Sequence, residues 1–122
     1  MIAKWFLHIF KHILKCFSSF SDPINVDFQT ALLKLLLDMS QTDVLVHLVK
    51  NHKSFRLKTN DRTDVCLLKC ELLVQLSNSN HGKPEIDHEI VKYLCHQLTQ
   101  SQFHTDVKSA ILKGTKILNY QI

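Results

Sequence analysis

Glycine and proline are scarce in this chain, with two of each among 122 residues. An all-β sandwich or barrel needs turn-forming residues at roughly every tenth position, so the composition argues against that class. There is also no glycine-rich stretch that could wrap a phosphate group. No uncharged apolar run reaches the roughly 18 residues that a membrane-spanning helix needs.

Arginine is rare as well. Of the 15 basic residues only Arg56 and Arg62 are arginine, and the others are lysine. Proteins that read nucleic acids depend on arginine for bidentate contacts to bases and phosphates. We therefore expect no nucleic-acid partner. The net charge of +4 is uneven, because residues 1–20 contain three lysines and no acidic residue.

The four cysteines lie inside apolar, periodic segments, and no asparagine stands in a glycosylation triplet. An even number of cysteines leaves a disulfide framework formally open. A helical chain of this length can bury a core without disulfides, and free cysteine is a common core residue. We expect an intracellular protein, cytoplasmic or nuclear, that needs no cofactor. Association with a membrane surface is the alternative.

Apolar residues recur at helical spacing, which predicts an all-α fold of about six antiparallel helices. The expected helices are residues 1–20, Ile24–Met39, Val44–Asn51, a helix from Thr63 or Asp64 to Leu76, Pro84–Leu98, and a helix from Thr105 or Asp106 to Leu118. The predicted buried face of the second helix is Phe28, Ala31, Leu32, Leu35, Leu36 and Met39. That of the fourth is Val65, Leu68, Leu72, Leu73 and Leu76. Residues 52–62 show no period and are expected to form an exposed connection.

The most specific feature is an internal repeat. Thr-Asp-Val occurs at 63–65 and again at 105–107, a separation of 42 residues, and the same string stands at 42–44. A frame of four apolar positions at 3-4-4 spacing is shared, with one substitution by glycine, among three helices: Phe28, Ala31, Leu35 and Met39; Val65, Leu68, Leu72 and Leu76; Val107, Ala110, Gly114 and Leu118. Over about residues 24–120 this resembles an armadillo or HEAT repeat array, whose units are two or three stacked helices. A compact helical bundle is the alternative.

The resemblance implies a curved surface that binds a protein or peptide. The third helix of each armadillo unit lines that surface, and its exposed positions here would be Lys34, Asp38, Lys69, Gln75, Lys113 and Lys116. No asparagine ladder recurs along these helices. The sequence therefore does not predict a specific clamp for a peptide backbone.

Residues 1–20 predict an amphipathic helix with a basic stripe opposite a wide apolar face. The stripe contains Lys4, Lys11 and Lys15, and the apolar face contains Trp5, Phe6, Phe10 and Phe17. We expect this helix to cap the end of the helical stack, either as a separate segment or as one domain with residues 21–122. Contact with an anionic membrane surface and insertion into a partner's groove are alternatives.

Some residue patterns have the spacing of metal-binding or catalytic sites. His8 and His12 are four residues apart, and so are Cys66 and Cys70, which Cys95 and His96 could join around zinc. Structural zinc sites usually take cysteines from loops, so we expect buried core thiols and a solvated histidine face. Asp87-His88-Glu89 places an imidazole between carboxylates, but consecutive helical residues point in different directions. We expect no catalytic, cofactor or metal site.

Residues 50–58 contain four cationic residues with Phe55 between them. Binding of phosphate or of an acidic partner is conceivable here, since such contacts need only positive charge. Asp61 and Asp64 follow closely, and an ordinary solvated connection is favoured. The hypothesis for the whole chain is a non-catalytic interaction module or scaffold. A membrane-surface protein anchored by its first helix is the alternative.

Overall fold

The structure is a computed structural model that describes residues 8–12, 15, 26–39, 44–58, 61–78, 84–99 and 105–119. Within these ranges the regular elements are α2 (Val26–Met39), α3 (Leu45–Lys50), the 3-10 helix η2 (His52–Phe55), α4 (Thr63–Asn78), α5 (Pro84–Gln97) and α6 (Thr105–Asn119). Residues 8–12 are helical too, and the described part of the chain contains no strand. The all-α prediction is confirmed, and α4, α5 and α6 begin where their capping residues indicated.

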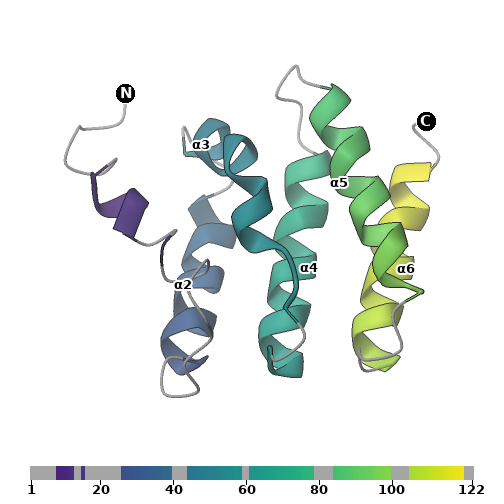
Figure 1. The fold of residues 1–122 in the computed structure, drawn as a ribbon, viewed down its shortest axis with the longest axis horizontal. Helices are drawn as coiled ribbons and strands as arrows, with labels where there is room; N and C mark the ends of the chain where they lie inside the picture. Colours follow the sequence, from purple (N-terminus) through teal and green to yellow (C-terminus); the bar gives the residue numbers. More distant parts are fainter. Residues whose placement is uncertain are drawn as a thin grey trace.

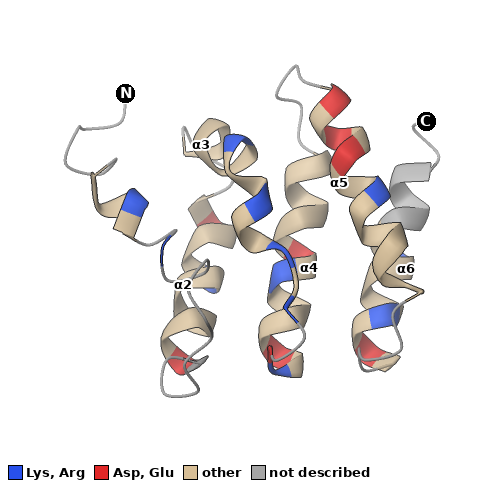
Figure 2. Cartoon of the chain, viewed as in Figure 1, with Lys and Arg blue, Asp and Glu red and all other residues tan. Residues whose placement is uncertain are grey.

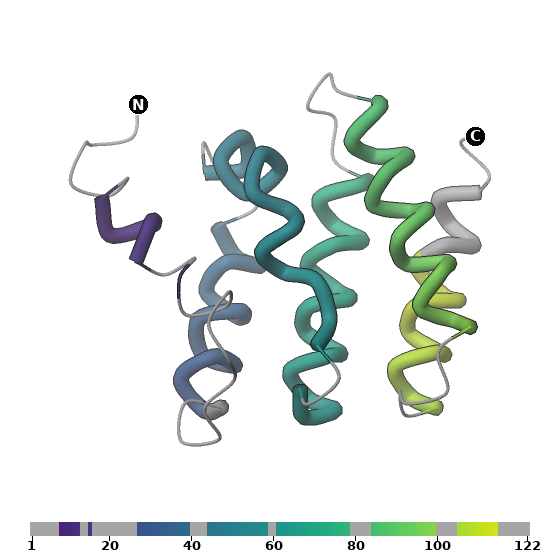
Figure 3. The backbone as a smooth tube through the Cα atoms, viewed as in Figure 1, coloured from purple at the N-terminus to yellow at the C-terminus, as the bar shows by residue number. Residues whose placement is uncertain are grey.

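The helices lie in two rows. Figure 1 shows α2, α4 and α6 side by side, with α3 and α5 in front of them. Helix α4 packs against α2 on one side and α6 on the other, and α5 contacts both α4 and α6. The tube in Figure 3 follows the chain as it alternates between the two rows. Helix α4 therefore lies at the centre of the molecule.

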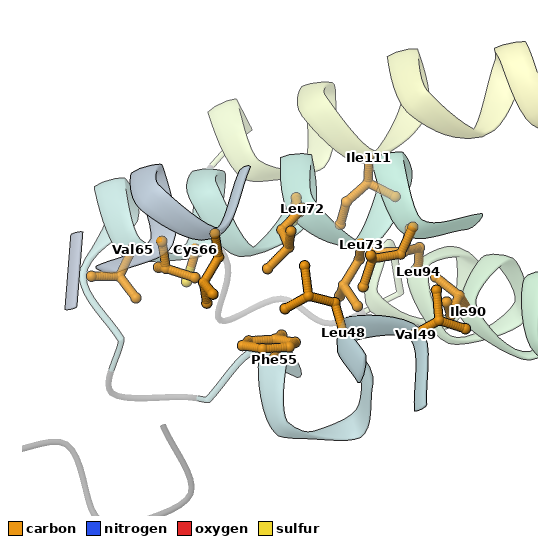
Figure 4. Packing of buried hydrophobic residues seen from close by; sticks show 14 of the residues in the cluster. Leu48, Val49, Phe55, Val65, Cys66, Leu72, Leu73, Ile90, Leu94 and Ile111 are labelled. Atoms are coloured by element: carbon orange, nitrogen blue, oxygen red, sulfur yellow. The ribbon is translucent and has the colours of Figure 1, made fainter. Parts of the chain in front are cut away.

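The core surrounds α4. Figure 4 shows Leu48, Phe55, Leu72 and Ile111 directed into one interior, although they come from four different elements. The central place of α4 explains why its buried residues extend around much of the helix: Val65, Cys66, Lys69, Cys70, Leu72, Leu73, Leu76 and Ser77. Four of the five predicted positions of this helix are among them, and Leu68 is half-buried.

The predicted face of α2 is wrong at several positions. Phe28 is 54% exposed and Leu35 is 49% exposed, whereas Gln29 and Leu33 are buried. At about 100° per residue, the buried face is turned by about a quarter of the helix circumference from the predicted one. Apolar residues cover a wide arc of α2, so spacing alone did not identify the part that packs.

The prediction of an exposed connection at 52–62 is also wrong. Residues 52–55 form η2, in which Phe55 is fully buried and His52 is 6% exposed. A single 3-10 turn followed by extended backbone has no helical or strand period, which is why the pattern gave no sign of it. The segment belongs to the core in front of α4.

Part of the predicted N-terminal helix is described. Phe10 is 3% exposed, and its ring centroid lies 6.3 Å from that of His47 in α3. Lys11 and Lys15 are exposed, as predicted for the basic stripe. The predicted residues Lys4, Trp5, Phe6 and Phe17 lie outside the described residues. Among the helices that are described, none has the length and apolar character to cross a membrane.

Candidate interaction surfaces

A groove of about 380 Å³ lies between α4 and α6. We call it the α4–α6 groove. Its lining residues are Leu67, Cys70, Glu71, Val74 and Gln75 from α4, and Ala110, Lys113 and Gly114 from α6. Most of this lining is apolar, and the charged residues come from opposite helices. Concave apolar surfaces with a few polar groups are the usual form of a binding site.

Gly114 sets how closely the two helices approach. A Cβ atom at this position would lie 2.5 Å from Cγ2 of Val74. Carbon atoms that are not bonded prefer a separation of about 3.5–4.0 Å, so any side chain here would collide with α4. In the sequence repeat Gly114 occupies the frame position that Leu72 holds in α4. The missing side chain thus shapes one wall of the groove.

The structure brings together two of the six predicted surface residues. Gln75 and Lys113 both line the α4–α6 groove. Lys34 and Asp38 are exposed on α2, outside that groove. Lys116 belongs to α6, but its side chain lies outside the described residues.

Lys69 is not a surface residue, so this prediction is wrong. Its side chain is 1% exposed, and its Nζ lies 2.6 Å from Oδ2 of Asp61, which is equally buried. Nζ also donates to the carbonyl oxygen of Arg56 at 3.3 Å, and the same Asp61 oxygen accepts from the backbone N–H of Lys58 at 3.0 Å. The pair fixes the segment after η2 against α4. A signal for its burial was present, because Lys69 stands at helical spacing from Val65 and Leu72.

A second cluster joins η2 to α5. The Glu89 carboxylate lies 3.9 Å from Nε2 of His52, 3.5 Å from Nζ of Lys53 and 3.7 Å from an Nη atom of Arg56. We call these four residues the Glu89 cluster. Figure 2 shows basic residues along α3, η2 and the following segment, and acidic residues in the first turns of α5. The sequence singled out residues 50–58 but not their acidic partner, which is over thirty positions away.

Tyr93 packs against the Glu89 cluster through Arg56. The Arg56 guanidinium lies 4.7 Å from the centre of the Tyr93 ring, within the range of a cation–π contact. The Tyr93 hydroxyl accepts a hydrogen bond of 2.8 Å from the backbone N–H of Leu57. Burial raises the pKa of Tyr93 to about 12. This phenol therefore stays neutral, and it holds the backbone after η2 in place.

Burial also decides the charge of His52. It lowers the pKa of His52 below the ordinary value of 6.5, opposed by Glu89 and reinforced by Arg56 and Lys53. The imidazole is consequently neutral at neutral pH. Lys53 and Arg56 then supply the positive charge around Glu89.

The thiols of α4 are core groups, as predicted. Burial raises the pKa of Cys66 to about 11 and that of Cys70 to about 12. The nucleophilic form of cysteine is the thiolate, so these thiols are unreactive at neutral pH. Cys95 is free and exposed, so the expectation of a buried core thiol is wrong for this residue. Among the described residues no group of three or more His, Cys, Asp or Glu side chains is placed to hold a metal ion.

The other histidines that the sequence singled out lie at exposed positions of the described chain. The rings of His8 and His12 meet edge to face with centroids 5.0 Å apart, on an exposed part of the chain. His88 is exposed, while its neighbour Glu89 faces η2.

Comparison of the chain with protein-family models, with curated proteins and with solved structures found no match.

Proposed function

We propose that this chain is a non-catalytic protein–protein interaction module that binds a segment of a partner protein in the α4–α6 groove. The observation that carries the proposal is the groove itself, an open apolar concavity between two helices of one row. Its position coincides with two residues, Gln75 and Lys113, that the repeat had marked as a binding surface. The free cysteines favour a reducing, intracellular setting.

The helix arrangement supports a short repeat array of the armadillo or HEAT type. Two of the three Thr-Asp-Val strings open α4 at Thr63 and α6 at Thr105, which are neighbouring helices of the same row, and the third stands directly before α3. Helix α5 contacts both, as an intervening helix of a stacked unit would. Arrays of this kind bind partners along the surface that their repeated helices share.

The chemistry of the groove indicates the kind of segment that it binds. Leu67, Val74 and Ala110 offer an apolar surface to a single aliphatic or aromatic side chain. Glu71 on α4 and Lys113 on α6 carry opposite charges on opposite walls. A peptide with an apolar anchor, a basic residue towards α4 and an acidic residue towards α6 is complementary to this pattern.

Membrane binding through the N-terminal helix has less support. Phe10, one of the apolar residues on which that hypothesis depends, is buried in the core and therefore does not face a lipid surface. The exposed basic residues Lys11 and Lys15 are compatible with either function. We place this alternative second.

The test is a selection of peptides from a random displayed library on the full chain. Ala110→Leu fills the groove, whereas Ser109→Leu adds the same side chain to an exposed neighbouring position of α6. We expect the selected peptides to contain an apolar anchor between charges of opposite sign. Their affinity should fall about tenfold or more with Ala110→Leu, since a filled pocket excludes the anchor.

Ser109→Leu should leave that affinity unchanged, and circular dichroism should show both variants folded. The charge reversals Glu71→Lys and Lys113→Glu, made separately, should each weaken the selected peptides. The proposal is wrong if no peptide is enriched, or if the enriched peptides bind both leucine variants as tightly as the original chain.

A further inference from the structure

The basic side chains of the Glu89 cluster have hydrogen-bond donors that Glu89 does not satisfy. The three ion pairs that the described residues make with the Glu89 carboxylate are 3.5 to 3.9 Å long. Charge-assisted hydrogen bonds between nitrogen and oxygen are usually about 2.7–2.9 Å long. Nε of Arg56 is buried and has no hydrogen-bond partner in the described part of the chain. The cations are attracted to Glu89, but its carboxylate does not satisfy their donors.

The cluster is open to solvent at three of its four side chains, whereas the His52 side chain is 8% exposed. The side chains are 67% exposed for Lys53, 42% for Arg56 and 44% for Glu89. Lys50, the last residue of α3 and two positions before η2, is exposed as well. A ligand can therefore reach the cationic groups without unfolding η2, while Tyr93 and the core hold them from behind.

The geometry favours one compact anion over a polyanion. The three side chains from η2 and its end converge on a single carboxylate. A nucleic-acid strand is instead bound by cations spread along a track of successive phosphates. Glu89 presents one negative charge and two oxygens to these side chains. A phosphate monoester brings close to two charges and three acceptor oxygens.

We propose that Lys53 and Arg56, with the imidazole of His52, form a binding site for a phosphate monoester on a partner peptide. Glu89 is an intramolecular competitor that the phosphate displaces. The site is separate from the α4–α6 groove, because it is built from η2 and α5. It stands or falls independently of the function proposed for that groove.

The experiment titrates the full chain with a capped pentapeptide, Ala-Ala-phosphoserine-Ala-Ala, and follows backbone amides by two-dimensional NMR. We expect shifts at residues 52–57 and around Glu89. The same peptide with unmodified serine should cause none of them. Glu89→Gln should tighten binding about fivefold by removing the competitor. Arg56→Gln should weaken it about tenfold, because a charge-assisted bidentate contact is lost.

Matched controls separate a site from general charge. Glu85→Gln removes the same charge one turn earlier on α5, at an exposed residue. It should change the affinity much less than Glu89→Gln. Lys34→Gln on α2 should not weaken binding, whereas Lys53→Gln, also at an exposed position and so without cost to folding, should. Ala110→Leu in the groove should leave phosphopeptide binding intact.

Three results would overturn the proposal. In one, Glu85→Gln and Glu89→Gln tighten binding equally, which would mean that only net charge matters. In another, inorganic phosphate binds as tightly as the phosphopeptide, so that the ligand is the free ion. In the third, the phosphopeptide fails to bind while vesicles of phosphatidylcholine and phosphatidic acid sediment the chain in an Arg56-dependent way, which would assign the site to lipid headgroups.

Discussion

The burial of side chains on α2 and on α4 departs from the sequence prediction in opposite ways. Helix α2 leaves Phe28 and Leu35 about half in water, whereas α4 buries the lysine Lys69 completely. The two helices are alike in apolar content, but α4 is surrounded by α2, α5, α6 and η2. The position of a helix in the fold thus determines which of its residues are buried. A charged residue that is buried there needs a partner of opposite charge. For Lys69 that partner is Asp61.

The largest effect is expected from the buried ion pair. Asp61→Asn leaves the charge of Lys69 without compensation, which should lower the free energy of unfolding by about 3–5 kcal/mol. Urea unfolding followed by circular dichroism measures the change. Lys34→Met, a loss of an exposed lysine on α2, should stay within about 0.5 kcal/mol of the original. A similarly small effect of Asp61→Asn would show that the pair does not hold the segment after η2.

Two leucines of α2 provide the next test. Leu33 is fully buried and Leu35 is half exposed, although the sequence predicted the reverse. Leu33→Ala should cost about 2–5 kcal/mol, as for other core leucines. Leu35→Ala should cost clearly less, because about half of this side chain is already in water. Equal losses in thermal and urea unfolding would mean that another segment covers Leu35.

Substitutions at the contact between α4 and α6 should change the free energy of unfolding by a smaller amount, and the effects at Gly114 and Val74 should depend on each other. Gly114→Ala adds a methyl group against Val74, and overpacking of this kind costs about 1–3 kcal/mol. Alanine recovers up to about 1 kcal/mol of helix propensity relative to glycine. We therefore expect a net loss of about 1 kcal/mol. Val74→Ala should relieve the collision, so the double variant should be more stable than the sum of the two single changes predicts.

The smallest expected effect concerns pH. Because the folded chain lowers the pKa of His52, the unfolded chain takes up a proton at a higher pH than the folded chain. Stability from this residue is therefore complete above the ordinary value of 6.5 and is lost as the pH falls through the folded value. Melting temperatures measured between pH 8 and pH 5 should decline less steeply for His52→Gln. An unchanged slope would indicate that His52 titrates normally in the fold.

The sequence was most informative where local chemistry decides the structure. Thr63, Pro84 and Thr105 mark the first residues of α4, α5 and α6, because capping and proline preferences depend on adjacent backbone groups. The repeat pointed to Gln75 and Lys113, which line the groove. The clusters at Asp61 and Glu89 were missed, because each joins residues from different elements and no spacing rule relates them.

The sequence by itself determined the helical class, the starts of the later helices and the cysteine-containing core of α4. These follow from helical periodicity and from the shortage of glycine and proline, which act over a few residues. Only the tertiary structure decided which side of α2 is buried, where Lys69 points and how Glu89 meets η2. Burial and ion pairing depend on which elements become neighbours. That choice is made by the packing of the whole chain around α4.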